Sequence, residues 1–462
     1  MLNLKEHSHI HCVGIGGVGL SAIAVLLLAQ GLKVSGSDMK ENAHTKQLQE
    51  SGATIYIGHA AENIKGADLL IYSVAVSPDN PELIAAREQN IPICTRADAL
   101  GLLMQNSPVS IAVSGTHGKT TTTSMVSLIL EHAGLQPTIL IGGNIEEFGG
   151  NVKVGNGSYF VTEACEYMDS FLTLKPLIEI IMNIDSDHLD YFTDIEHIVR
   201  SFAQFASQVP ENGTIFAYEG NPLVNAIIPD LQCRVITFGF NRECGYYATD
   251  IEFNSLGLPA FTLNKNGEEP LGRIKLAVPG EHNVINALAA AACCHFIGVG
   301  MPEIIRTLEA FNGTQRRFDV LGTTAHGLRI VDDYAHHPTE IKATLKAALN
   351  IPHKNLWCIF QPHTYTRTRA LFDDFAEAFG DADKVILTDI YAAREKNIHK
   401  ISSQDLADAM KKAHPEKDIY YIPEFEPIVQ FILENAQKGD LIISMGAGDV
   451  YKVAELLLAT DR

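Results

Sequence analysis

A turn near residue 115 carries the residue types that hold the phosphates of a nucleotide. Residues 110–124 read SIAVSGTHGKTTTTS, so an apolar strand leads into glycines, a lysine and threonines. Gly115 and Gly118 let backbone amides approach phosphate oxygens. Lys119 supplies a positive charge, and the Thr120 hydroxyl is a ligand type that Mg²⁺ accepts. The turn therefore predicts a nucleoside triphosphate site.

The spacing within this turn departs from the common phosphate-binding loop. That loop reads G-x-x-x-x-G-K-[ST], whereas only Thr116 and His117 separate the two glycines here. The turn nevertheless follows a strand and opens a helix predicted over residues 119–133, with Gly134 as its stop. This setting disfavours the alternative of a glycine turn with an incidental lysine.

Two further residues stand where strands of the same region should end, and they could complete a metal site. Glu163 follows the apolar strand predicted over residues 159–162, and His188 follows the one predicted over 178–184. The carboxyl ends of parallel strands share one edge of a sheet, so both side chains could converge on Lys119. Two alternatives stay open: Glu163 as a helix-capping carboxylate, and His188 as a histidine in a polar loop.

Polar clusters also occur in the last third of the chain. Residues 332–338 read DDYAHHP before a predicted helix, and residues 361–369 read QPHTYTRTR after a strand predicted over 356–360. Arg316 and Arg317 precede both, and arginine suits bidentate recognition of phosphate or carboxylate. A capped polar turn and solvated arginines are the structural alternatives, but clustering at strand ends favours a functional role.

The first hundred residues alternate strand and helix patterns around a second glycine-rich turn. Residues 14–19 read GIGGVG after the strand predicted over 9–15, and Asp38 ends the next strand. This pattern ordinarily predicts a dinucleotide, with the acidic residue on its ribose. Such turns also bind other phosphate-bearing ligands, so a nicotinamide-dependent oxidoreductase is one alternative among several.

The alternation of strand and helix patterns continues along the chain and predicts an α/β protein of three domains. We expect an N-terminal Rossmann-like parallel sheet over residues 1–106, a central P-loop ATPase-like α/β domain over 107–319 and a C-terminal Rossmann-like α/β domain over 320–462. The first boundary rests on Asn106-Ser-Pro108, which breaks the pattern. In the central domain we expect an alanine-rich helix over 284–296, introduced by a turn at 279–283.

Composition narrows the class of protein. The chain is 46% hydrophobic, as expected for a globular protein. Its 462 residues are too many for a single hydrophobic core, so several domains are expected. No apolar run is long enough for a membrane span and no signal pattern opens the chain, so we expect a cytoplasmic protein without a membrane partner. A net charge of −20 argues against nucleic-acid binding. Eight cysteines show no zinc spacing and are expected to be reduced core thiols.

Taken together, these segments resemble the Mur ligase family, the ATP-dependent enzymes that build the peptide stem of bacterial peptidoglycan, over essentially the whole chain. The compact turn at 115–121 is specific to that group. Residues 14–19, 332–340 and 361–369 resemble the member that joins L-alanine to UDP-N-acetylmuramate. In this family the first domain holds the UDP portion, so the resemblance implies a UDP site where the turn alone predicted a dinucleotide.

The resemblance also implies roles for the matching residues. The catalytic residues would be Lys119, Glu163 and His188, and the Mg²⁺ ligands would be Thr120, Glu163 and His188. ATP would contact Gly115, Thr116, His117, Gly118, Lys119, Thr120, Thr121, Asn283, Asn286, Arg317 and Asp333. The UDP substrate would contact Gly14, Gly16, Gly17, Gly19, Asp38 and Ser73. The pocket for the amino acid would contain Tyr334, His363 and Arg367.

The implied reaction is the ligation of L-alanine to UDP-N-acetylmuramate, with ADP and phosphate as the other products. ATP would convert the muramyl carboxylate, a poor electrophile, into an acyl phosphate that the alanine amine attacks. Mg²⁺ would assist, and Mn²⁺ could replace it. The third domain is expected to close over the second and exclude water. The partners would be these small molecules, and the protein a monomer or a homodimer.

Two departures from the family pattern bear on this expectation. The segment 163–169 reads EACEYMD in place of a more acidic form, which keeps Glu163 and Glu166 but alters their neighbours. No lysine occurs between Leu177 and Asn264, where sister ligases for later amino acids carry a modified lysine, so its absence favours the alanine-adding member. A ligase that recycles a preformed tripeptide is the nearest alternative, and a non-catalytic nucleotide-binding regulator is a more distant one.

Overall fold

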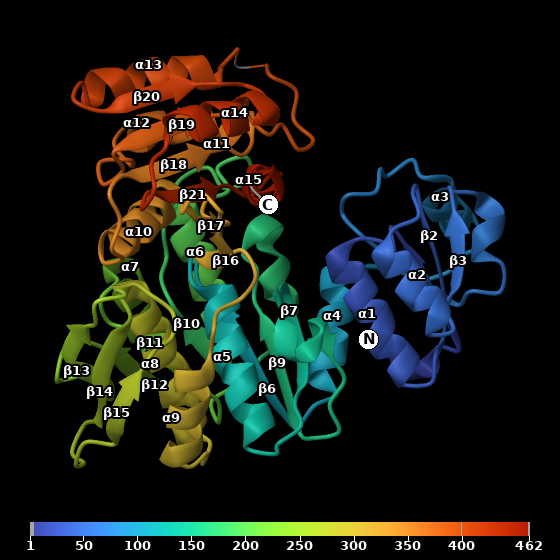
Figure 1. Ribbon diagram of the computed structural model, residues 1–462. Helices are drawn as coiled ribbons and strands as arrows, with labels where there is room; N and C mark the ends of the chain where they lie inside the picture. Colours follow the sequence, from blue (N-terminus) through green and yellow to red (C-terminus); the bar gives the residue numbers. More distant parts are fainter. Residues whose placement is uncertain (1–3, 399, 461–462) are drawn as a thin grey trace.

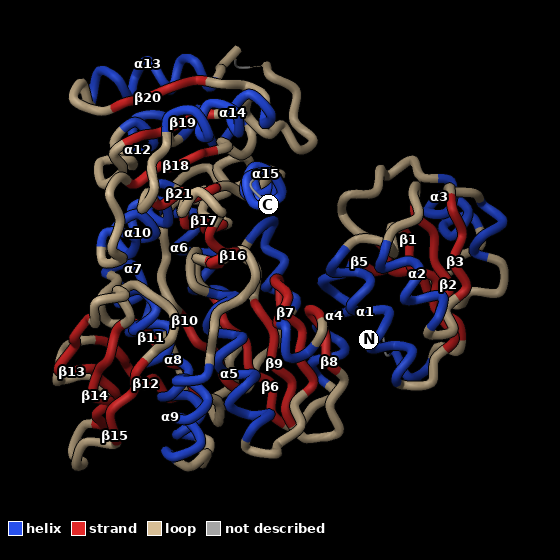
Figure 2. Tube along the Cα trace, in the orientation of Figure 1, coloured by secondary structure: helices blue, strands red, loops and turns tan. Residues whose placement is uncertain are grey.

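Three sheets follow one another along the chain in the computed structural model, which describes residues 4–398 and 400–460. Each sheet is flanked by helices, as Figures 1 and 2 show. The α/β class and the three-domain architecture predicted from the sequence are confirmed. The N-terminal domain stands to one side of the other two, which lie against each other (Figure 1).

The N-terminal sheet is entirely parallel, with the strand order β3-β2-β1-β4-β5. Its strands are β1 (His9–Val13), β2 (Lys33–Asp38), β3 (Thr54–Ile57), β4 (Leu69–Tyr72) and β5 (Ile93–Thr95), and its helices are α1 (Val18–Ala29), α2 (Ala43–Glu50), α3 (Pro81–Glu88) and α4 (Arg96–Gln105). The chain order reverses between β1 and β4. In such sheets this switch point is where ligands bind, beyond the carboxyl ends of the strands.

The central sheet has the order β15-β14-β13-β12-β11-β10-β6-β9-β7-β8, parallel in its middle and antiparallel at both ends. Its strands are β6 (Val109–Ser114), β7 (Thr138–Ile145), β8 (Gly150–Lys153), β9 (Tyr159–Glu163), β10 (Ile178–Ile181), β11 (Thr214–Tyr218), β12 (Arg234–Gly239), β13 (Tyr246–Phe253), β14 (Pro259–Lys265) and β15 (Gly272–Lys275). Its helices are α5 (Lys119–His132), α6 (Ile195–Ala206), α7 (Pro222–Ile227), α8 (Glu281–Phe296) and α9 (Met301–Ala310). Buried alanines of α8 let it pack closely on α5.

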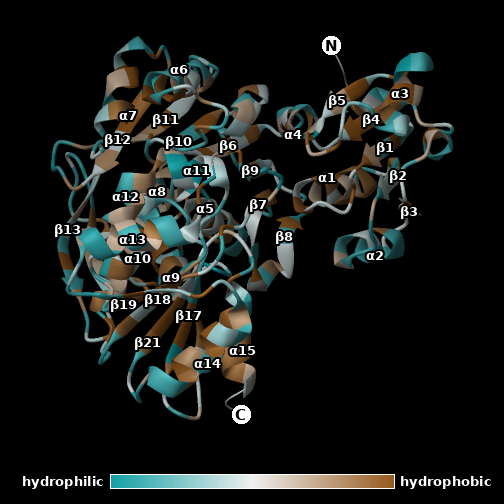
Figure 3. Cartoon of the chain, turned by 90° about the horizontal axis from the view of Figure 1, so that it is seen from above, coloured by the Kyte–Doolittle hydropathy of each residue, from teal (hydrophilic) through white to brown (hydrophobic). Residues whose placement is uncertain are grey.

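The C-terminal sheet has the order β16-β17-β21-β18-β19-β20, and only β16 runs antiparallel to its neighbour. Its strands are β16 (Asp319–Thr323), β17 (Arg329–Asp333), β18 (Leu356–Phe360), β19 (Lys384–Leu387), β20 (Asp418–Tyr421) and β21 (Leu441–Met445). Its helices are α10 (Pro338–Leu349), α11 (Tyr365–Ala370), α12 (Phe372–Ala376), α13 (Ser403–Ala413), α14 (Phe425–Asn435) and α15 (Tyr451–Thr460). Strands β17 and β21 are hydrophobic in Figure 3, as buried parallel strands should be.

Two expectations about local structure need correction. Helix α8 begins at Glu281, so residues 281–283 are helical and do not form the expected turn. Gly280, with φ 96°, makes the sharp entry by itself. The cysteines are all unpaired, but Cys165 is exposed and Cys233 half-buried, so they are not uniformly core thiols. Across residues 4–398 and 400–460, no helix combines the length and apolar character needed to cross a membrane.

Candidate active site

The turn after β6 is shaped by two glycines that no other residue could replace without strain. Gly115 has φ 134° and Gly118 has φ 83°, both in the region that favours glycine. A Cβ atom on Gly115 would lie 2.9 Å from the Cβ of Met182, and one on Gly118 would lie 2.7 Å from Oδ1 of Asn286. The two glycines therefore allow the backbone to pass close to both β10 and α8.

The loop after β10 holds this turn in place. The Asn183 side chain accepts a hydrogen bond from the His117 amide at 2.8 Å, and the Asn183 carbonyl accepts one from the Thr116 amide at 3.2 Å. Helix α5 then starts at Lys119, and no side chain caps its first turn. Its free amides and the positive end of its dipole suit an anion such as phosphate.

A cavity of about 260 Å³ lies at this turn, between the central and C-terminal domains. The residues predicted to bind ATP that line it are His117, Gly118, Thr120, Thr121, Asn283, Asn286, Arg317 and Asp333. Gly115, Thr116 and Lys119, also predicted, belong to the turn but do not line the cavity. Residues from both ends of the predicted set, more than 200 positions apart, thus share one pocket.

The cavity also has apolar and aromatic walls that were not predicted from the sequence. They are formed by Tyr218, Val278, Ile285, Phe311 and Phe318. Asn283 and Asn286 lie one helical turn apart on α8 and share a hydrogen bond of 3.0 Å. Tyr218 ends β11, so its position at a strand's carboxyl end was the signal that could have identified it. Such walls fit a flat aromatic base.

Lys119 contacts a buried carboxylate. Its Nζ donates to the Thr116 carbonyl at 3.0 Å and to the Glu166 carboxylate at 2.9 Å. Glu166 is only 2% exposed. Burial lowers the pKa of Lys119, but Glu166, Cys165 and Glu163 together outweigh this effect and raise it. Lys119 is therefore a charged group. The sequence alone did not predict a role for Glu166.

The residues predicted to hold a metal lie around this ion pair. Glu163, at the end of β9, accepts a hydrogen bond from the Gly142 amide at 2.6 Å. A Cβ on Gly142 would lie 2.9 Å from Oε2 of Glu163, so this close approach requires glycine. Burial raises the pKa of Glu163, while Lys119 and the Thr120 hydroxyl act in the opposite direction. Gly142 was missed, although a glycine pair inside a strand can indicate a close backbone approach.

His188 approaches the same group from the loop after β10. Its Nε2 lies 3.7 Å from Oε1 of Glu166, and its ring packs on Tyr167 at 4.7 Å between centroids. Carboxylates, a hydroxyl and one imidazole form an oxygen-rich donor set, which suits Mg²⁺ or Mn²⁺. The donor chemistry therefore fits a divalent metal. Thr120 hydrogen-bonds Glu163, whereas His188 contacts Glu166, the partner of Lys119.

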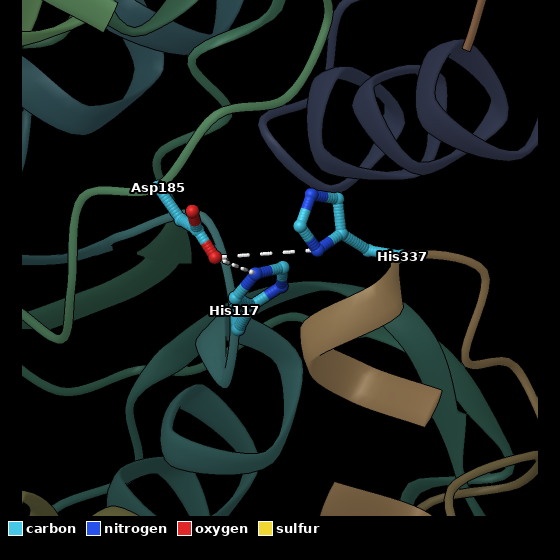
Figure 4. A group of neighbouring side chains, drawn as sticks. All are labelled: His117, Asp185 and His337. Atoms are coloured by element: carbon cyan, nitrogen blue, oxygen red, sulfur yellow. Dashed lines mark hydrogen bonds and ion pairs between the residues drawn. The ribbon is translucent and has the colours of Figure 1, made fainter. Parts of the chain in front are cut away.

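A second group of metal-ligand type lies on the opposite side of the turn. Among the described residues, one group of three side chains of metal-ligand type has its ligand atoms within 4.8 Å of one another. It consists of His117, Asp185 and His337 (Figure 4). His117 Nε2 lies 3.2 Å from Asp185, and its Nδ1 lies 3.3 Å from Glu340 of α10. Burial lowers the pKa of His117, but these hydrogen bonds outweigh it and raise the pKa to about 9. His117 thus links the two domains.

Arg317 and Asp333 enter the cavity from the C-terminal side. Arg317 lies 3.5 Å from Glu340, which leaves part of its guanidinium facing the cavity. Asp333 accepts hydrogen bonds from the Phe318 and Ala335 amides at 2.8 and 2.7 Å. Burial raises the pKa of Asp333 to about 6. Asp333 therefore both faces the cavity and fixes the backbone at Phe318 and Ala335.

The residues predicted for the amino-acid pocket are only partly together. Arg367 binds Asp187 through Nε and Nη2, both at 2.9 Å, and its Nη1 lies 3.1 Å from His363. Burial raises the pKa of Asp187, but the charge of Arg367 together with three nearby histidines outweighs it and holds the pKa well below its usual range. Tyr334 packs instead against the guanidinium of Arg317 at 5.2 Å. Arg367 and His363 form one contact group, and Tyr334 belongs to the neighbouring one.

The residues predicted to bind the UDP portion lie together at the switch point of the N-terminal sheet. The Gly16 amide donates to Asp38 at 2.9 Å, so this carboxylate braces the glycine turn itself. Gly14, with φ 83°, donates to the Ser37 carbonyl at 2.8 Å. The remaining predicted residues, Gly17, Gly19 and Ser73, lie in or beside this turn at the ends of β1 and β4.

A buried carboxylate beneath that turn was not anticipated. Glu82 on α3 is fully buried and accepts hydrogen bonds from Ser37 at 2.5 Å and Asn63 at 2.6 Å. His59 lies 3.1 Å from the same group. Burial raises the pKa of Glu82, but His11, Ser37 and Asn63 together outweigh it and lower the pKa to about 2. The carboxylate therefore anchors the end of β2, on which the glycine turn rests.

Comparison with known proteins supplies an independent result. Three family models match consecutive parts of the chain: "Mur ligase family, catalytic domain" at residues 9–108, "Mur ligase middle domain" at 113–294 and "Mur ligase, glutamate ligase domain" at 316–448. A UDP-N-acetylmuramate–L-alanine ligase of Alkaliphilus metalliredigens is 50% identical over 459 residues, which cover 99% of each chain. The enzyme of that name from Acetivibrio thermocellus is 49% identical and covers 99% of this chain and 97% of its own.

Solved structures resemble the whole chain as well. A UDP-N-acetylmuramate-alanine ligase from Thermotoga maritima has a TM-score of 0.80 and 29% identity, with 98% of both chains covered. A murein peptide ligase from Psychrobacter arcticus has a TM-score of 0.72 and 26% identity, again with 98% of both chains covered. The similarity therefore includes all three domains.

Proposed function

The chain belongs to the Mur ligase family, and from this premise we propose that it joins L-alanine to UDP-N-acetylmuramate while ATP is converted to ADP and phosphate. The observation that carries the proposal is the cavity between the central and C-terminal domains, where the phosphate turn meets Arg317 and Asp333. Relatives named as alanine ligases, about half identical over their full length, support the choice of amino acid. The protein is an ATP-dependent ligase that acts on small molecules.

The nucleotide would lie with its base against the apolar wall near Tyr218 and Phe311 and its phosphates at the start of α5. The free amides of that helix turn would bind phosphate oxygens, and Arg317 would approach from the other domain. Phosphate oxygens would compete with Glu166 for the charge of Lys119. Binding of ATP is thus expected to redistribute an existing ion pair.

We propose that the divalent ion is Mg²⁺, which Mn²⁺ could replace. Thr120, Glu163 and His188 would hold it. Such an ion offsets the charge that develops on phosphoryl oxygens during transfer. Gly142 orients Glu163 through the backbone hydrogen bond. Glu166 joins Lys119 to His188, so the lysine and the metal ligand are positioned by one carboxylate.

The reaction would begin with transfer of the γ-phosphoryl group to the muramyl carboxylate. The alanine amine would then attack the acyl carbon of the acyl phosphate, and phosphate would leave. Arg367, with His363 beside it, would bind the alanine carboxylate, and Asp187 would keep the guanidinium oriented. Tyr334 would line the same approach. Contact between α10 and the phosphate turn would exclude water from the intermediate.

The UDP portion would bind at the glycine turn formed by Gly14, Gly16, Gly17 and Gly19, with Asp38 and Ser73 beside it. A free amide row and small residues at the start of α1 favour a diphosphate there. The proposed setting is the cytoplasm, where the nucleotide-linked precursors are made, and the protein would be a monomer or a homodimer. We propose neither a nucleic acid nor a membrane as partner.

A tripeptide-recycling ligase is the second candidate, because the Psychrobacter arcticus murein peptide ligase resembles the whole chain. It would share every nucleotide contact and differ in the amino-acid pocket. An ADP-release assay with UDP-N-acetylmuramate and either L-alanine or the preformed tripeptide separates the two. We expect rapid release with L-alanine and little with the tripeptide or with no amino acid, and the reverse preference would contradict the proposal.

A further inference from the structure

The group drawn in Figure 4 has the geometry of a second, different metal site. Asp185 Oδ2 lies 3.2 Å from His117 Nε2 and 4.0 Å from His337 Nδ1. In tetrahedral zinc sites, bonds of about 2.0 Å place neighbouring ligand atoms about 3.3 Å apart. Small rotations of the two rings would therefore bring all three atoms to bonding distance of one ion.

The far side of each imidazole is held as in known histidine metal sites. His337 Nε2 lies 2.8 Å from the Ser186 carbonyl, which can only accept, so this nitrogen carries the proton. Its Nδ1 then presents a lone pair, and it accepts only a long hydrogen bond of 3.2 Å from the Thr339 amide. His117 Nδ1 lies 3.3 Å from Glu340, and its Nε2 donates a proton toward Asp185 at 3.2 Å, so a bound ion would replace that proton and release it to water. Acceptors behind both rings orient them and raise their basicity toward a metal.

We propose that His117, Asp185 and His337 bind a divalent transition-metal ion of the Zn²⁺ class. Two imidazoles and one carboxylate favour Zn²⁺ over Mg²⁺, because Mg²⁺ prefers oxygen ligands and retains its water. Three protein ligands leave a fourth position for water or another oxygen. This site is distinct from the oxygen-rich set around Glu163.

The location gives such an ion a defined effect. His117 and Asp185 line the nucleotide cavity, and His337 belongs to the C-terminal domain at the start of α10. An ion held by all three would join the two domains and withdraw His117 from the phosphate turn. Zn²⁺ bound there inhibits ligation by competing with ATP, even when Mg²⁺ is in excess.

Calorimetric titration of Zn²⁺ into the full-length protein, with excess Mg²⁺ present, tests the site directly. We expect His337→Asn to weaken binding by more than about tenfold, because losing even an outer partner of a metal ligand costs about that much. Asparagine is a good helix N-cap, so α10 should keep its start and the variant should fold as the wild type does. His188→Asn is the matched control, because it alters the other site and should leave Zn²⁺ binding unchanged.

Equal binding by wild type and His337→Asn, or loss of binding in His188→Asn alone, would overturn the proposal. Co²⁺ absorption of the wild-type protein provides a second measurement that needs no variant. Strong visible bands without thiolate charge transfer support the site, whereas a thiolate band would place the ion at Cys165 or Cys233 and refute it. Both measurements report binding, so their failure is distinguishable from failure of the ligation reaction.

Discussion

Lys119 lies against Glu166 in a mostly enclosed pair, with 15% and 3% of the two side chains exposed. A lysine in this setting is held in a fixed position and kept charged. The pair also means that removing the lysine does more than remove a phosphate contact, because it leaves a carboxylate buried without its partner. Activity and stability should therefore respond separately to substitutions here.

Lys119→Ala is expected to abolish ADP release while the protein still folds. Because Glu166 loses its partner, the free energy of unfolding should fall by about 3 kcal/mol. Denaturant titration measures the second effect and the ADP-release assay the first. Near-normal turnover in this variant would contradict the role given to Lys119.

The double substitution Lys119→Ala with Glu166→Gln is the matched control. It removes the unpaired charge, so stability should recover toward that of the wild type while activity remains absent. If both variants lost stability equally, the buried carboxylate would not be the cause.

Strand β10 carries a second buried carboxylate, directly beneath the phosphate turn. Glu179 is fully buried and accepts a hydrogen bond of 2.7 Å from Ser114, the last residue of β6. Its other oxygen has no partner among the described residues. Burial raises the pKa of Glu179 from 4.5 to about 8, so at neutral pH it is a neutral acid.

This shift makes stability depend on pH. In the folded protein Glu179 keeps its proton up to about pH 8, whereas the unfolded chain loses it near 4.5. The contribution of Glu179 to the free energy of unfolding is therefore complete below pH 4.5 and is lost as the pH rises through 8. We expect Glu179→Gln to remove this part of the decline, so the variant should lose less unfolding free energy than the wild type over that interval.

Denaturant titration at several pH values measures the effect, and the difference between the two proteins isolates it from other titrating groups. Glu211→Gln, at an exposed position, is the control and should follow the wild-type profile. Parallel profiles for Glu179→Gln and wild type would show that Glu179 is ionised in the folded protein.

Across the whole molecule, the two proposed substrate sites belong to different bodies of the structure. None of the described N-terminal residues, from Leu4 onward, lines the nucleotide cavity, and the N-terminal domain stands apart from it in Figure 1. Its contacts with the central domain run mainly from α1 to β7 and β8 and from α4 to residues 167–173. Binding of UDP-N-acetylmuramate and of nucleotide should therefore be separable by mutation.

Gly16→Ala is expected to weaken UDP-N-acetylmuramate binding about tenfold, the scale of overpacking by one methyl group. Its Cβ would lie 2.8 Å from the Asn42 amide nitrogen and 2.9 Å from Asp38, so the turn must shift. Nucleotide affinity should be unchanged. Gly118→Ala is the reciprocal control and should weaken nucleotide binding alone, and calorimetry of both variants with both ligands checks the pattern. Loss of both affinities in either variant would contradict it.

Much of this architecture was predictable because it depends on local order. The strand, glycine turn and helix around Lys119 are adjacent in sequence. The spacing of their apolar residues and the residue types of the turn predict all three. The same holds for the turn at Gly14. The expected start of α8 was wrong because Gly280 reaches a positive φ and turns the chain in a single residue. Local pattern thus identified the elements and placed candidate residues at strand ends.

The sequence by itself determined the elements, the class of fold and the turn that can hold phosphate. Only the tertiary structure decided which side chains meet, because contacts such as Lys119 with Glu166 or Arg367 with Asp187 join separate strand ends or separate domains. Hydrogen-bond partners and burial then set the charge of each group, as in the case of Glu179. Neither quantity is a property of a segment, since both arise when distant parts of the chain exclude water from one another.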